Sequence, residues 1–308
     1  MGNFIPSIGH VSIRSDGISF FEQIVAFLSG RMDTPTLFGW YHILCLLITI
    51  GLCVFVFLKA RNLSDKQMDW IFGITSITMI VLEIYKQIVF SYDSASDMWN
   101  YQWYAFPFQF CASPMYVMFT AFLIKNEKVK EAAYSFMATY ALFAGTAVMF
   151  YPGDVFTGMI GINIHTMMHH GAMVVIGVLM YVSGRVKFSH KTILKALPIF
   201  AILASTALLL NVLFEFFGPE GHVFNMFYIS PFHPCTLPVL SLFYGQVPYA
   251  VFLMLYLFGF TLAGYVMSLL AMLSSKAFCF VTEKLVAHKA PETPANDESN
   301  NELPEQTL

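Results

Sequence analysis

Three histidines lie close together in an apolar stretch of the chain: His165, His169 and His170. His165 and His169 are four residues apart, which puts both side chains on one face of a helix. A second apolar stretch contains Gln109 and Cys111. A single cysteine inside a membrane helix is most often a small apolar filler. A cysteine at the same depth as several histidines, however, has the residue types for catalysis.

Three chemistries fit this combination. In the first, a histidine activates Cys111 as a thiolate nucleophile that carries an acyl group. In the second, His165 and His169 ligate a metal ion together with Glu83, Glu215 or Cys111. In the third, the polar residues relay protons or ions in a transporter, without a covalent step. The spacing favours none of the three, although the absence of a glutamate base after the H-x-x-x-H pattern weakens the metallohydrolase version.

Other polar residues also fall in apolar stretches, where each is a functional candidate because burying it in a membrane is costly. They are Glu83, Lys86, Gln109, Asn211 and Glu215. Glu83 and Lys86 are three residues apart, so they can also neutralise each other while Lys86 reaches towards the surface. Gln109 and Asn211 are equally consistent with hydrogen bonds between helices.

The composition predicts an all-α membrane protein, a bundle of about seven transmembrane helices. The 308 residues are 57% hydrophobic and only 11% charged, whereas soluble domains carry roughly a quarter charged residues. A membrane-spanning helix needs about 20 mostly apolar residues. Stretches of this kind predict spans at 37–58, 69–90, 104–124, 131–151, 160–183, 196–217 and 244–272.

The distribution of Lys and Arg predicts the orientation of the bundle. The loops after the first, third and fifth predicted spans are basic, whereas 91–103, 152–159 and 218–243 contain no Lys or Arg. Basic loops remain in the cytoplasm, so the N-terminus is expected outside and the C-terminus in the cytoplasm. Cys111 then lies about 10 Å, and the histidines about 14 Å, below the outer face. They are level with one another if the third and fifth spans are neighbours.

Three regions follow from this reading. Residues 1–36 are expected to form an extracytoplasmic N-terminal segment with a short interfacial helix. Residues 37–272 form the seven-helix transmembrane domain. Residues 273–308 form a cytoplasmic, largely disordered tail, because the chain becomes polar and acidic there.

Several motifs resemble the YwaF-like integral membrane family, which includes vertebrate transmembrane proteins proposed to be lysophospholipid acyltransferases. The run from Phe106 to Cys111 resembles the "LP-(H/Q)-LC" signature of that family, and His169-His170-Gly171 resembles its histidine-glycine signature. Asn211, followed by the run from Asn225 to Tyr228, resembles its "N…NYM-L" stretch. The order and spacing of these motifs extend the resemblance from about the second span to the seventh.

The resemblance implies a seven-helix fold and, in the best-studied branch of the family, acyl transfer to lipid by a cysteine and a histidine. Carried onto this sequence, Cys111 is the nucleophile and His170 the general base, with His169 as a second choice. Gln109 or Asn211 would donate hydrogen bonds to a developing oxyanion. The expected substrate-binding residues are Gln109, Asn211, Glu83, Lys86, Asn225 and Tyr228.

The expected partners are membrane lipids, including an acyl-donor lipid, with no nucleic acid and no cofactor, in a bacterial cell membrane. Cys235, beside Pro234 and near His233, is a rival nucleophile in an outer loop that is expected to be wetter. A disulfide between Cys235 and Cys111 would exclude the thiol mechanism. A transporter or channel that uses Glu83, Lys86, His165 and Glu215 remains an alternative, as does a non-catalytic receptor or scaffold.

Overall fold

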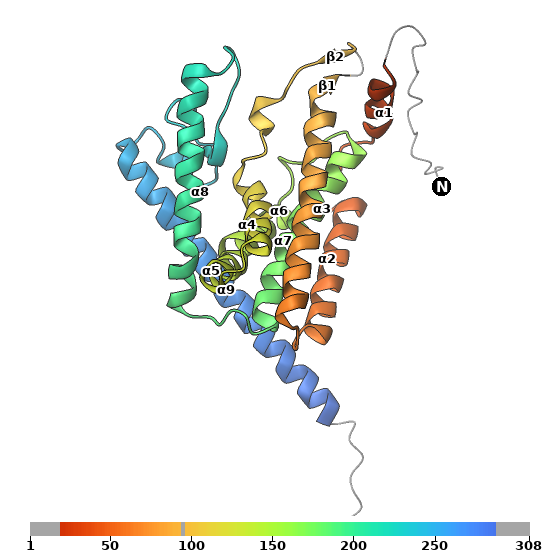
Figure 1. Ribbon diagram of the computed structural model, residues 1–308, viewed down its shortest axis with the longest axis vertical. Helices are drawn as coiled ribbons and strands as arrows, with labels where there is room; N and C mark the ends of the chain where they lie inside the picture. The colour runs from red at the N-terminus through yellow and green to blue at the C-terminus, as the bar shows by residue number, and fades with distance from the viewer. Residues whose placement is uncertain (1–18, 94–95, 288–308) are drawn as a thin grey trace, which may run out of the picture.

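A computed structural model describes residues 19–93 and 96–287, and these are almost wholly helical (Figure 1). Six helices in this part of the chain are long and apolar enough to cross a membrane, and each overlaps one predicted span. They are α2 (Trp40–Lys59), α3 (Asp65–Ser91), the α5–α6 segment (Glu127–Phe150), α7 (Ile160–Val182), α8 (His190–Phe217) and the first part of α9 (Tyr249–Ala287). The predicted all-α membrane class is confirmed.

The remaining predicted span, 104–124, begins later than expected. Its continuous helical part begins only at η2 (Phe110–Ala112), which leads into the short apolar helix α4 (Ser113–Leu123). Pro107 prevents an earlier start, because a proline disfavours helical geometry in the residue before it, and Phe106 is accordingly extended, with ψ of 140°. Cys111 therefore lies in the first turn of a short helix, and not seven residues into a full span.

Both ends of the described chain are helical. A helix is present where an interfacial helix was predicted: α1 (Phe20–Leu28) begins with a capping box between Ser19 and Glu22. Its place at the membrane interface stays a prediction. Val25 is buried, whereas Phe20 and Phe27 project outward. At the other end, α9 continues to Ala287. The predicted boundary at residue 272 therefore falls inside a helix, and the acidic part of the tail beyond residue 287 lies outside the described residues.

A small hairpin follows α3 and connects it to α1. Strands β1 (Tyr92–Asp93) and β2 (Met98–Trp99) pair antiparallel, with Tyr92 opposite Trp99. The indole nitrogen of Trp99 donates a hydrogen bond to Glu22 Oε1 at 3.1 Å. The short helix η1 (Trp103–Ala105) then leads to the extended run before η2.

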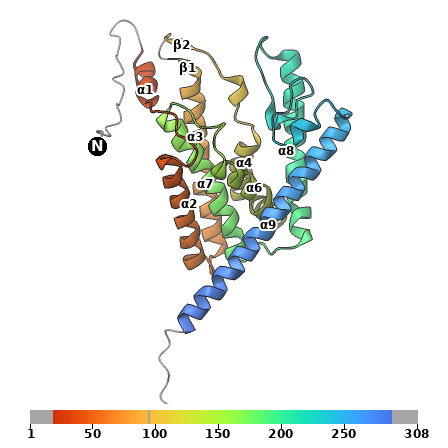
Figure 2. The same cartoon turned by 180° about the vertical axis from the view of Figure 1, so that it is seen from behind.

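The α5–α6 segment and α7 form the buried centre of the bundle, with α2 and α3 on one side and α8 on the other (Figure 1). Within the α5–α6 segment, α5 (Glu127–Phe136) is joined to α6 (Leu142–Phe150) by a π-helical turn, η3 (Met137–Ala141). Glycines let α6 and α7 approach closely: a Cβ added at Gly145 would lie 2.7 Å from Met173 Cβ. The long helix α9 crosses this centre obliquely (Figure 2).

Basic side chains hold one end of the bundle together. Lys195 Nζ lies 2.6 Å from Glu131 Oε2, Lys130 Nζ lies 2.7 Å from Asp69 Oδ1, and Arg185 pairs with Asp65. The hairpin, the 152–159 turn and the 218–248 loop lie at the opposite end. That long loop contains η4 (Met226–Tyr228) and η5 (Leu240–Leu242). The basic loops and the loops without Lys or Arg thus lie at opposite ends of the bundle, as predicted. Their assignment to the cytoplasm and the exterior stays a prediction.

Candidate functional site

Helix α3 contributes a buried carboxylate, Glu83, and one of its two oxygens has two polar partners. Glu83 is 3% exposed, and Lys86 and Gln87 follow it by three and four residues, on the same helical face. Lys86 Nζ lies 2.6 Å from Glu83 Oε1, and Gln87 Nε2 donates to the same oxygen at 2.8 Å. These two contacts compensate the negative charge and leave the second oxygen, Oε2, turned towards α7.

Helix α7 meets this carboxylate through the predicted histidine pair. His165 Nε2 lies 3.2 Å from Glu83 Oε2, although the geometry does not qualify as a hydrogen bond. The rings of His165 and His169 have centroids 5.4 Å apart, because a separation of four residues stacks them on one face. Glu83, His165 and His169 therefore surround a common point, and all three are buried.

His169 also connects α7 to the turn that carries the cysteine. Its Nε2 lies 2.9 Å from the backbone oxygen of Cys111. A carbonyl oxygen only accepts, so Nε2 carries the proton and Nδ1 keeps a lone pair. Through this contact, the third and fifth predicted spans are neighbours. The expectation that Cys111 and the histidines lie at one depth depended on that adjacency.

His170 has its tautomer set by its own helix. Its Nδ1 lies 2.7 Å from the backbone oxygen of Thr166, so Nδ1 donates and Nε2 retains the lone pair. Nε2 of His170, Nδ1 of His169 and both ring nitrogens of His165 are buried and have no hydrogen-bond partner among the described residues. Buried polar atoms are nearly always paired with protein or ordered water, so these four nitrogens are open to a water molecule, an ion or another ligand.

The thiol of Cys111 has no hydrogen bond to these histidines among the described residues. The described residues link the cysteine to the histidine helix through its backbone oxygen alone. Cys111 is partly exposed and interacts electrostatically with the Lys86 ammonium. It also lies at the start of the η2–α4 segment, where the positive end of the helix dipole favours a negative sulfur.

Two of the predicted substrate-binding amides hold the long loop between α8 and α9 through hydrogen bonds. Asn211 is 1% exposed; its Nδ2 donates to Met226 O at 3.0 Å, and its Oδ1 accepts from Met226 N at 2.7 Å. Asn225 accepts from Ser230 N at 2.9 Å and donates to Pro234 O at 3.0 Å. Both side chains thus satisfy backbone groups of the 225–234 run.

Gln109 has a similar position at the start of η2. Its Oε1 accepts from Phe227 N at 3.3 Å, and its Nε2 donates to Tyr104 O at 3.2 Å. Phe227 and Tyr228 have positive φ values of 59° and 56°, which are uncommon for bulky residues. The surrounding amides hold this strained turn, and the Tyr228 side chain remains partly exposed at the surface.

Two predicted site residues lie elsewhere. Glu215 is exposed on α8 and does not join the Glu83 cluster, so the expectation that it shares the site is wrong. Cys235 is only 4% exposed although it lies in a loop, which contradicts the expectation of a wetter position. Burial raises the pKa of the Cys235 thiol and so disfavours its thiolate. Cys235 and Cys111 are both unpaired, with no disulfide between them.

Comparison with known proteins identifies the family. The TMEM164 family model matches residues 37–262, most of the chain. The chain belongs to the TMEM164 family. No curated protein and no solved structure matches it. The match covers Cys111, the three histidines and the loop amides, while the predicted YwaF-like relation and the acyltransferase branch stay predictions.

Three further residues of this TMEM164-family chain were not singled out from the sequence. Two of them contact the cluster, and the third is a buried histidine outside it. Gln87 connects Glu83 to Ala105 O and accepts from the Tyr101 hydroxyl; its position four residues after Glu83 was the available signal. Thr166 fixes the tautomer of His170 through its carbonyl, which no side-chain pattern reveals. His42 is a fully buried histidine on α2 that takes no part in the cluster.

An apolar groove of about 570 Å³ lies between α2, α3 and α7. Ile48, Thr49, Thr75, Met168 and Gly171 are among the residues that line it. Several of its side chains, such as Ile48 and Met168, are half exposed on the outer surface of the bundle. The groove and the histidine cluster involve the same two helices, α3 and α7, but no residue of the cluster lines the groove.

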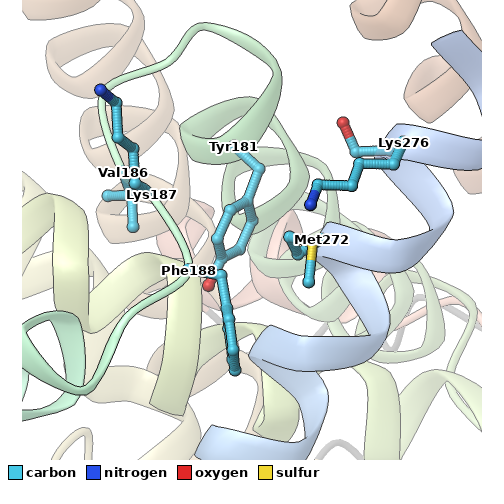
Figure 3. Close-up of a pocket in the computed structure, with 7 residues that line it drawn as sticks. Tyr181, Val186, Lys187, Phe188, Met272 and Lys276 are labelled. Atoms are coloured by element: carbon cyan, nitrogen blue, oxygen red, sulfur yellow. The ribbon is translucent and has the colours of Figure 1, made fainter.

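A smaller pocket of about 330 Å³ lies at the other end of α7 and is shown in Figure 3. Its lining comes from Tyr181, the loop after α7, and Met272 and Lys276 of α9. The Lys276 side chain extends towards Tyr181, whereas the Lys187 ammonium points away (Figure 3). Tyr181 is roughly 17 Å along the helix from His170, so this pocket is separate from the histidine cluster.

Proposed function

We propose that this TMEM164-family chain is a membrane-embedded acyltransferase or lipid hydrolase that forms an acyl thioester on Cys111. The observation that carries the proposal is the hydrogen bond from His169 to the Cys111 backbone. It holds the cysteine turn against α7, the helix that also carries His170, whose Nε2 lone pair is buried and unused. The proposal requires the Cys111 thiol to come within reach of that base, because a thiol beside a base with a fixed tautomer is the arrangement that nucleophilic catalysis needs.

In the proposed reaction, Nε2 of His170 takes the thiol proton as the Cys111 sulfur attacks the ester carbonyl of an acyl-donor lipid. The ester C–O bond breaks, and His170 returns the proton to the leaving lysolipid oxygen. A second hydroxyl, from an acceptor lysolipid or from water, then attacks the thioester and releases the thiol. His169 is the weaker choice of base, because its Nε2 proton already holds the Cys111 carbonyl.

The developing oxyanion has a better donor than the amides first considered. Gln109 and Asn211 are occupied by backbone partners. We propose instead that the N–H of Cys111 itself donates, because the next two N–H groups already bond to Gln109 O and Phe110 O. The beginning of a helix also favours negative charge. Asn225 and Tyr228 would then shape the mouth of the site, while Glu83 and Lys86 contribute its charged wall.

In this proposal, the acyl chain of the lipid binds in the apolar groove. It has the right chemistry because nearly all of its lining is aliphatic, thioether or aromatic. Its half-exposed residues on the flank of membrane-spanning helices give a lipid chain direct lateral access. Combined with the loop charges, this predicts a substrate from the outer leaflet of a bacterial cell membrane, with membrane lipids as partners.

The test is acyl transfer by the full-length chain in lipid nanodiscs that contain a phospholipid with a labelled acyl group and an unlabelled lysolipid. Cys111→Ala is expected to abolish both transfer and a hydroxylamine-sensitive acyl adduct on the protein. Cys53→Ala is the matched control, because Cys53 lies on α2 and has no contact with the histidine cluster. Its transfer rate is expected to equal that of the unaltered chain.

Three outcomes would contradict the proposal. An adduct and a turnover that survive Cys111→Ala would exclude the thiol mechanism. An adduct that disappears only in Cys235→Ala would assign the nucleophile to the loop cysteine. Ion or solute flux in proteoliposomes that survives Cys111→Ala but is lost in Glu83→Gln would favour the transporter alternative.

A further inference from the structure

We propose that Glu83, His165 and His169 bind a divalent transition-metal ion, with Zn²⁺ the best fit. The three residues come from α3 and α7, and each offers a donor atom within 4.8 Å of the other two. All three are more than nine-tenths buried. Two imidazoles and one carboxylate form a common catalytic zinc ligand set, in which a fourth position is left to water or substrate.

The distance between two of the donors agrees with such a site. Ligands that lie 2.0–2.1 Å from a tetrahedral zinc ion are about 3.3 Å from one another. His165 Nε2 and Glu83 Oε2 are 3.2 Å apart and are not aligned for a hydrogen bond. An ion between them would explain both the close approach and the poor hydrogen-bond geometry.

His169 has the outer contact that metal-binding histidines usually have. Such a histidine donates its second ring N–H to a carbonyl or carboxylate, which fixes the tautomer and directs the other nitrogen at the metal. Here Nε2 donates to Cys111 O at 2.9 Å, and the lone pair of Nδ1 is buried without a partner. A bound ion would therefore also fix the turn that carries Cys111.

The carboxylate is supported in the same way. Lys86 and Gln87 both contact Oε1 of Glu83, which orients the group and leaves Oε2 for the ion. The competing explanation is a plain ion pair between Glu83 and Lys86. That ion pair satisfies the carboxylate but leaves unpaired nitrogens on both His165 and His169, and these are what the metal site explains.

The experiment measures metal on the untagged full-length chain, purified in detergent after growth with zinc. Mass spectrometry of the metal content is expected to find about one ion per chain, and Co²⁺ exchange is expected to give the visible d–d bands of a nitrogen–oxygen site. His165→Ala is expected to remove at least about nine-tenths of the metal and these bands. His222→Ala, in the exposed outer loop, is the matched control and is expected to retain both.

Lys86→Met separates the metal site from the ion pair even if His165→Ala misfolds. Removing a positive charge next to a cation strengthens cation binding, so zinc affinity is expected to rise by roughly ten-fold or more. The plain ion pair predicts instead a less stable chain that contains no metal. Absence of both zinc and a cobalt spectrum in the unaltered chain and in Lys86→Met would overturn the proposal.

The metal site and the thiol mechanism can fail separately. Cys111→Ala is expected to retain the ion, because it keeps the backbone oxygen that His169 contacts. An unaltered chain that forms the acyl adduct without any metal would overturn the metal site alone. A chain that binds zinc but forms no adduct would overturn the thiol mechanism alone.

Discussion

Two polar clusters lie towards the end of the bundle that carries the 218–248 loop, and they differ in how their hydrogen bonds are satisfied. In the loop cluster, formed by Gln109, Asn211 and Asn225, every amide side chain is bonded to backbone groups of that loop or of the run before η2. In the histidine cluster, formed by Glu83, His165, His169 and His170, four ring nitrogens have no partner among the described residues. The first cluster thus completes the fold, whereas the second keeps unpaired ring nitrogens, on which the proposed metal site rests.

His42 shows that burial alone does not explain the unpaired histidines. It is 0% exposed, yet its Nε2 lies 2.8 Å from Met149 O and its Nδ1 accepts from Phe38 N at 2.9 Å. A purely structural histidine in this bundle therefore finds two partners. Because an unpaired buried polar group costs free energy, a site that keeps four of them sacrifices stability, as functional sites commonly do.

The contrast between the two clusters predicts its largest effect on the acyl-transfer rate. His170→Ala is expected to lower the acyl-transfer rate by about 10²–10⁴-fold, the usual contribution of a general base. Its unfolding temperature should fall less than that of His42→Ala. Both variants remove a buried ring, but His170 bonds only to its own helix. The rate is measured in nanodiscs and the unfolding temperature by intrinsic fluorescence.

His42→Ala is the matched histidine control. It is expected to lower the unfolding temperature, because it removes a partner from Met149 O and from Phe38 N, while the rate per folded molecule is retained. The opposite pattern, with activity lost in His42→Ala and kept in His170→Ala, would reverse the assignment of the two histidines.

The second effect is on stability in the loop cluster. Asn211→Ala is expected to lower the free energy of unfolding by about 2–4 kcal/mol, because it leaves both backbone groups of Met226 buried without a partner. Denaturant titration in mixed micelles measures it. Leu209→Ala, at an exposed position on the same helix, should have a much smaller effect. An Asn211→Ala chain of unchanged stability but no activity would make the amide a substrate contact after all.

The smallest effect concerns the groove. A Cβ added at Gly171 would lie 2.9 Å from Thr49 Oγ1, so Gly171→Ala is expected to cost about 1 kcal/mol and to raise the KM for long-chain donors. Thr49→Ala removes that oxygen, and the double variant should recover most of both losses. A KM that is unchanged in Gly171→Ala, or equally raised in the double variant, would place the acyl chain elsewhere.

The amino-acid sequence by itself determined the membrane class and the approximate position of the spans. Hydropathy has to match the thickness of a bilayer, so six of the predicted spans have counterparts of sufficient length. It also determined that His165 and His169 share a face, because the helical period is local. The helix of the third predicted span begins later than its hydropathy suggests, and Pro107 was the signal for this in the sequence. The proline keeps Phe106 out of helical geometry although the surrounding run is apolar.

Only the tertiary structure decided which of these polar residues meet. Periodicity assigns a face to each helix but not the neighbour of that face, so nothing local separates Glu83, which joins the histidines, from Glu215, which is exposed. The same holds for the contact between His169 and the Cys111 carbonyl and for the burial of Cys235 in a loop. Whether a buried polar group finds a partner depends on segments far away in the chain, and for this protein that difference separates structural residues from candidate functional ones.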